Sequence, residues 1–96
     1  MYLSAFPRKD RYVLGQKCET TLLELIEDIV LASNLSKSEK LPTLKKASAK
    51  VDILRVLFKL GKDLKIIENK KYTVLDSSIT EIGKMLGGWI KVTNQS

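Results

Sequence analysis

Apolar residues recur along most of the chain with the spacing of amphipathic helices. From Pro7 to about Ser33 they are separated by steps of three and four, which keeps them on one face of a helix. This first stripe consists of Leu14, Cys18, Leu22, Leu25, Ile29 and Ala32. No stretch alternates polar and apolar residues for long enough to predict a strand. We therefore expect an all-α protein whose first helix begins near Pro7.

A second helix is expected from about Pro42 to Ile67, because proline is tolerated in the first turn of a helix. Ser36, with Glu39 three residues later, marks an alternative start of the capping-box type. Two apolar stripes run along this segment: one is Leu44, Ala47, Val51, Leu54, Phe58 and Gly61, the other Ile53, Leu57, Leu60, Leu64 and Ile67. A helix that is apolar on more than one face should lie between two neighbours.

The third helix is expected to start at Asn69, as an N-cap residue, and to run to about Val92. Its apolar stripe is Tyr72, Leu75, Ile79, Ile82, Leu86 and Trp89. Short polar breaks between three long helices predict an up-down antiparallel bundle. Since no linker-like composition interrupts the chain, we expect residues 1–96 to form a single helical-bundle domain.

The charge is concentrated in the second helix and the residues that lead into it. The chain has 17 Lys and Arg against 11 Asp and Glu, a formal net charge of +6, and residues 35–65 carry nine of the cations with three acids. Arg55, Lys59 and Lys62 form one ridge, which Lys45, Lys46 and Lys50 are expected to extend. Such a ridge suits phosphate contacts with RNA or DNA. The alternative interpretation is a solvated face whose cations pair with Asp52 and Asp63.

Three glycines and a tryptophan stand near the end of the third helix, in the stretch EIGKMLGGWIK. Each glycine inside a helix costs about 0.5–1 kcal/mol relative to alanine. This cost would be offset if the glycines let another helix approach closely, at Gly83, Gly87 and Gly88. Trp89 would supply a large apolar contact. We expect these residues to serve helix packing or self-association; the alternative is that Trp89 only covers the core of one chain.

The residue types needed for catalysis or metal binding are scarce. The chain has no histidine and one cysteine, Cys18, which lies on the first apolar stripe. We expect Cys18 to be buried and inert, and we interpret Glu24, Glu27 and Asp28 as a solvated acidic face. We therefore predict no enzymatic activity, no metal and no cofactor. With no run long enough to span a membrane and no pair of cysteines for a disulfide, a cytoplasmic protein is expected.

Three stretches of the chain resemble a known family: FPRKDRYVLGQKCETTLLELIEDIVLAS, VDILRVLFKLGKDLKII and EIGKMLGGWIKV. Together they are similar to the accessory variability determinant (Avd) proteins of diversity-generating retroelements. These belong to a four-helix bundle group that also contains proteins encoded in intervening sequences of 23S rRNA. The resemblance covers roughly residues 6–92 and is most specific in IGKMLGGWI and in Leu54, Arg55 and Lys59.

This resemblance implies a non-enzymatic partner of a reverse transcriptase, encoded by a bacterium or phage, that supports mutagenic copying of a template RNA. It also implies a homopentameric, barrel-like assembly with basic surfaces. Arg55 and Lys59 match the basic pair that the family uses toward the enzyme and nucleic acid. The first of the family's four helices would be missing, because only five residues precede Phe6. The alternative function is a stand-alone structural bundle of the intervening-sequence type, with no polymerase partner.

Overall fold

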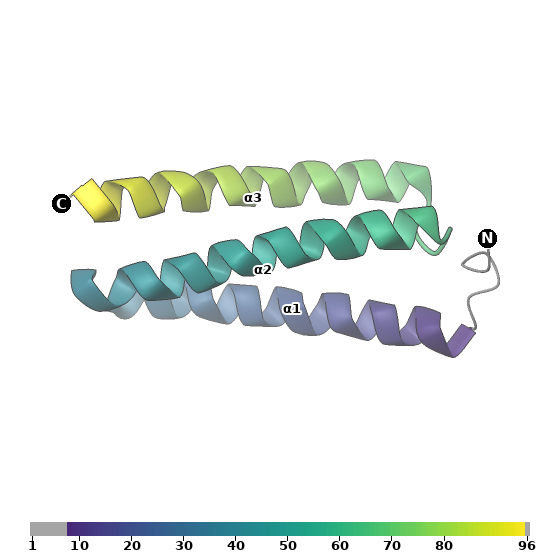
Figure 1. The fold of residues 1–96 in the computed structure, drawn as a ribbon, viewed down its shortest axis with the longest axis horizontal. Coiled ribbons are helices and arrows are strands. Elements are labelled where there is room, and N and C mark those ends of the chain that lie inside the picture. The colour runs from purple at the N-terminus through teal and green to yellow at the C-terminus, as the bar shows by residue number, and fades with distance from the viewer. Residues whose placement is uncertain (1–7, 96) are drawn as a thin grey trace.

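The computed structural model describes residues 8–95. They form three helices of equal length, α1 (Arg8–Asn34), α2 (Lys37–Asp63) and α3 (Asn69–Gln95), which run up, down and up (Figure 1). No strand occurs among these residues, so the all-α prediction is confirmed for the described part of the chain. The expected helix start at Pro7 lies outside the described residues. Asn69 is the first residue of α3 rather than the residue before it.

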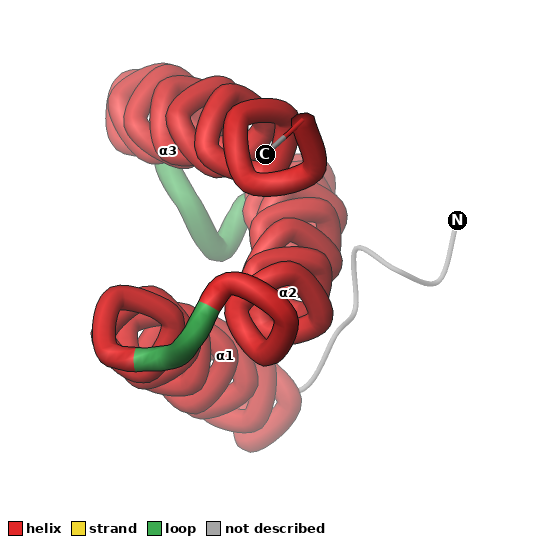
Figure 2. Tube along the Cα trace, turned by 90° about the vertical axis from the view of Figure 1, so that its left-hand side faces the viewer, coloured by secondary structure: helices red, strands yellow, loops and turns green. Residues whose placement is uncertain are grey.

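Helix α2 is the centre of the molecule. It packs against both α1 and α3, whereas α1 and α3 bring no pair of described Cα atoms within 8 Å of each other. Seen along the helices, α1 and α3 lie on the same side of α2 and leave that side open between them (Figure 2). The expectation that the second helix lies between two neighbours is therefore confirmed.

The core follows the first apolar stripe of α2. All six of its residues are buried, from Leu44 to Gly61. The second stripe is divided: Leu64 is buried, Leu57 and Ile67 are half-buried, and Ile53 and Leu60 are exposed. On α3, Ile79 and Leu86 are buried, while Tyr72 and Trp89 pack at the edge of the same core. One face of α2 thus supplies most of the shared interior.

The buried face of α1 differs from the expected stripe. Leu14, Leu25 and Ala32 are buried as predicted, but Leu22 is 40% exposed. Thr21 and Asp28, at 2% and 9% exposure, are buried instead. The contact face is therefore rotated by about 40°, less than one residue position at about 100° per residue, because α1 packs on α2 alone and turns its other apolar edge away. The interpretation of Asp28 as part of a solvated acidic face was wrong.

Helix α2 begins at Lys37, directly after Ser36, and not at Pro42. Ser36 is the N-cap residue, and its hydroxyl donates to Glu39 Oε1 at 3.1 Å. No side-chain hydrogen bond caps the backbone, so the capping box is only partly formed. Pro42 lies in the second turn, where the loss of one backbone hydrogen bond is tolerated near the helix start.

Helix α2 also ends earlier than expected, at Asp63 instead of Ile67. The amide of Ile66 donates to the carbonyl of Gly61 at 2.8 Å, and the amide of Lys65 donates to that of Lys62 at 3.0 Å. These two bonds are the Schellman termination, in which one residue adopts the left-handed conformation. Lys65 takes that position with φ of 61°. Glycine is the usual residue in this left-handed position. Because the chain has a lysine instead, the sequence contained no signal for the end of the helix.

Candidate nucleic-acid and partner interface

The six predicted basic residues do not form one continuous patch. Arg55, Lys59 and Lys62 lie on one side of α2, since their spacing of four and three residues keeps them within a narrow arc. Lys45 falls near the same side, four turns from Lys59. Lys46 is nine residues from Arg55, which at about 100° per residue places it on the opposite side of the helix. Lys50 lies on that opposite side too.

Lys50 is held in the interface between α1 and α2. Its Nζ lies 2.6 Å from Asp28 Oδ2, and the two side chains are 20% and 12% exposed. In a pair buried to this extent, the attraction between the two groups offsets the cost of removing them from water. The structure thus gives Lys50 a packing role, and the surface charge that it contributes is neutralised by Asp28.

The three cations of the Arg55 side differ in their partners. Lys59 Nζ lies 3.3 Å from Asp63 Oδ1, an exposed pair within α2. Lys62 Nζ stands 5.0 Å from the ring centre of Tyr72 on α3. Arg55 is exposed and makes no ion pair or side-chain hydrogen bond with the described residues. Exposed pairs are weak, so all three cations remain available to an acidic partner.

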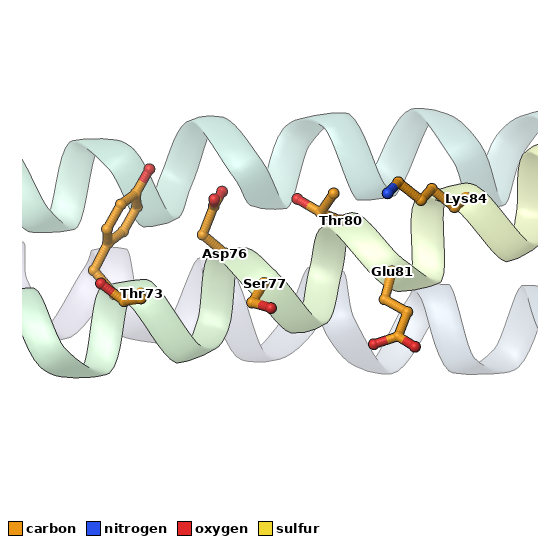
Figure 3. Close-up of a pocket in the computed structure, with 7 residues that line it drawn as sticks. Thr73, Asp76, Ser77, Thr80, Glu81 and Lys84 are labelled. Carbon is orange, nitrogen blue, oxygen red and sulfur yellow. The ribbon is translucent and has the colours of Figure 1, made fainter.

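Sequence reasoning missed a depression on α3 of about 560 Å³. The residues that line it all carry polar groups and come from one helix: Tyr72, Thr73, Asp76, Ser77, Thr80, Glu81 and Lys84. In Figure 3, Asp76 and Thr80 point toward α2, whereas Glu81 points away from it. The spacing of Asp76, Thr80 and Lys84 by four residues was visible in the sequence, but a solvated helix face has the same pattern.

The glycines of α3 fall into two groups. A Cβ on Gly83 would lie 3.2 Å from Val51 Cγ1, so Gly83 allows the close contact of α3 with α2. Gly87 and Gly88 have no atom of another residue within 4 Å of that position. Trp89 is half-buried, with Lys40 Nζ 5.7 Å from its ring centre. Of the three α3 glycines, only Gly83 packs against another helix within residues 8–95.

Metal-binding side chains do not converge in the described residues. Within residues 8–95 no three His, Cys, Asp or Glu side chains are placed to hold a metal ion. Cys18 is half-buried in the core edge, and this burial raises the pKa of its thiol. A raised pKa lowers the thiolate fraction and makes the sulfur a poorer nucleophile at neutral pH.

The fold of the described residues defines an all-helical bundle protein. Within the described part, no helix combines the length and the apolar character that a membrane span requires. The family model described as bAvd-like matches residues 1–93, and the chain belongs to this family. The resemblance to the Avd proteins is thereby confirmed, and the protein is an accessory protein of the Avd type. No curated protein and no solved structure matches the chain.

Proposed function

We propose that this protein is a non-enzymatic adaptor of a diversity-generating retroelement, which binds the reverse transcriptase and nucleic acid in the cytoplasm. The observation that carries the proposal is the alignment of Arg55, Lys59 and Lys62 on one side of α2, with Arg55 unpaired among the described residues. Cations on a rigid helix meet a phosphate backbone with little conformational cost, and they release its counterions. Membership of the bAvd-like family supports the association with a retroelement.

Lys45 and Lys46 have secondary places in this proposal. Both are exposed, but Lys46 faces away from Arg55 and would meet a different part of a partner. Lys50 would contribute through the packing of α1 against α2. We therefore assign the contact with enzyme and nucleic acid first to Arg55, Lys59 and Lys62.

The test is co-purification of the protein with a reverse transcriptase encoded beside it. The double variant Arg55→Glu, Lys59→Glu should lose the complex while its helical circular-dichroism spectrum stays unchanged. Arg11→Glu with Lys17→Glu makes the same change of charge on exposed positions of α1 and should keep the complex. A complex retained by the α2 variant would contradict the proposed surface. A folded wild-type protein with no complex would favour the stand-alone structural bundle.

We further propose that the chain works as a homo-oligomer, the pentameric barrel that the family resemblance implies. Among the described side chains, 13 large hydrophobic residues are exposed and 11 hydrophobic residues are buried. Such a balance is unusual for a monomer and indicates surfaces that another chain covers. They include Leu22 and Ile26 on α1 and Met85 and Val92 on α3. Gly87, Gly88 and Trp89 would contribute a close helix contact between subunits.

Light scattering coupled to size exclusion tests this assembly. The mass at micromolar concentration should be a multiple of the 10.8 kDa chain, five times for the barrel. Gly87→Leu with Gly88→Leu should lower the mass, because both positions have room within one chain but would block a close approach by another. A monomeric wild type would contradict self-association. An unchanged mass of the variant would contradict only the role of the two glycines.

A further inference from the structure

The depression on α3 lies between cations at its two ends. Lys62 of α2 stands over the ring of Tyr72, which lines one end, and Lys84 lines the other. Because Val51 lies against Gly83, Arg55 falls level with the stretch of α3 between Tyr72 and Gly83. The depression is therefore part of the same surface as the basic ridge of α2.

Its shape and lining do not suit a small apolar ligand. Pockets for such ligands are concave and lined mostly by apolar side chains. Here one helix supplies a row of hydroxyl, carboxylate and ammonium groups along an open surface (Figure 3). Successive members of the series Asp76, Thr80 and Lys84 are about 6 Å apart along the helix axis, a spacing comparable to that of phosphates along a strand.

Asp76 is the unexpected group on this surface. Its side chain is half-buried, and it forms no ion pair or side-chain hydrogen bond with the described residues. A carboxylate on the same surface as Lys62 and Arg55 would repel a phosphate and weaken binding of any nucleic acid. The Asp76 carboxylate stabilises a complex only where the nucleic acid offers a hydrogen-bond donor between its phosphates. The ribose 2′-hydroxyl of RNA is such a donor, and DNA lacks it.

We propose that Asp76 accepts a hydrogen bond from a ribose 2′-hydroxyl, while Lys62 and Lys84 contact phosphates farther along the backbone on either side of that sugar, so that this face selects RNA over DNA. The hydroxyls of Ser77 and Thr80 lie beside Asp76 and can contact the same sugar; the hydroxyl of Thr73 donates to the carbonyl of Asn69. No aromatic side chain alternates with the cations of α2, which favours a paired RNA backbone over stacked bases. This inference rests on the proposed nucleic-acid function and names its ligand class.

The experiment measures affinity by fluorescence anisotropy at one fixed salt concentration, for duplexes of one sequence made of RNA, 2′-fluoro RNA or DNA. The 2′-fluoro duplex keeps the A-form shape but has no 2′-hydroxyl donor. Wild-type protein should bind RNA about tenfold more tightly than the 2′-fluoro duplex, the effect of one hydrogen bond to a charged group. Asp76→Ala should remove this difference and bind the 2′-fluoro duplex at least as well as wild type does.

Glu19→Ala is the matched control, because it removes the same charge from an exposed position of α1 that does not line the depression. It should strengthen binding to all three duplexes alike and leave the preference intact. Equal wild-type affinity for RNA and 2′-fluoro RNA, or a preference that survives Asp76→Ala, would overturn the inference and leave the proposed function standing. Binding to none of the duplexes would contradict the proposed nucleic-acid function itself.

Discussion

Lys50 Nζ lies 2.6 Å from Asp28 Oδ2 and joins α2 to α1 by an ion pair that is largely shielded from solvent. The two residues are on different helices and 22 positions apart in the chain. Asp28 therefore lies on the edge of α1 that faces α2, while Leu22 lies on the exposed side. Lys50, which was assigned to the binding surface on the basis of its charge alone, is thus part of the packing between α1 and α2.

Replacement of Lys50 by Met should lower the free energy of unfolding by about 2–3 kcal/mol, because it leaves the buried Asp28 carboxylate without its partner. Urea denaturation of Lys50→Met, Asp28→Leu and the double variant measures the coupling between the two residues. The same cycle on Lys59 and Asp63, each 55% exposed, should give no more than about 0.5 kcal/mol. Equal coupling for the two pairs would show that burial of Lys50 and Asp28 is energetically unimportant.

Gly61 and Gly15 should respond in opposite directions to alanine. A Cβ on Gly61 would lie 2.6 Å from Ile67 Cδ1 and 3.0 Å from Ile67 Cγ1, so the turn after α2 must shift to make room. We expect Gly61→Ala to lower the free energy of unfolding by about 1 kcal/mol, since overpacking outweighs the gain in helix propensity. Gly15 has open space at that position, and Gly15→Ala should raise stability by about 0.5–1 kcal/mol. Thermal denaturation of both variants tests the difference in sign.

Lys65 should be a site where glycine stabilises the protein. Its φ of 61° places an L side chain in the left-handed region, which costs about 1–2 kcal/mol for residues other than glycine. Lys65→Gly should recover about 1 kcal/mol of unfolding free energy, measured by chemical denaturation. Lys65→Ala is the control, because it removes the charge but keeps the unfavourable φ, and it should change stability little. Equal stabilisation by both variants would assign the effect to charge instead of backbone conformation.

The reactivity of Cys18 should depend on pH in a way that reports its burial. Burial raises the pKa of its thiol, so the native protein holds this proton more tightly than the unfolded chain. The stability linked to it is present below the ordinary thiol pKa and is lost as the pH rises through the native pKa. The rate of alkylation by iodoacetamide should therefore rise at higher pH in native protein than in denaturant. Coincident profiles would show that the thiol is fully accessible in the native state.

Much of the candidate surface could be read from spacing. Arg55, Lys59 and Lys62 share a side of α2 because steps of four and three residues keep side chains together on any helix. The same rule, applied to the nine-residue step from Lys46 to Arg55, predicts opposite sides, so this separation was available without a structure. The partner of Lys50 could not be predicted from spacing, because Asp28 comes from another helix. The polar depression around Asp76 also needed the position of α2 beside α3.

The spacing of the apolar residues and the composition determined that this protein is all-α and that its central helix lies between two others. They also determined which face of that helix is buried. These properties depend on residues a few positions apart, whose relation is set by the geometry of a single helix. The tertiary structure decided the rotation of α1, the pairing of Lys50 with Asp28 and the end of α2 at Asp63, before the left-handed Lys65. Each of these depends on contacts or backbone strain that only the packed chain can stabilise, since no local preference of the residues involved favours them.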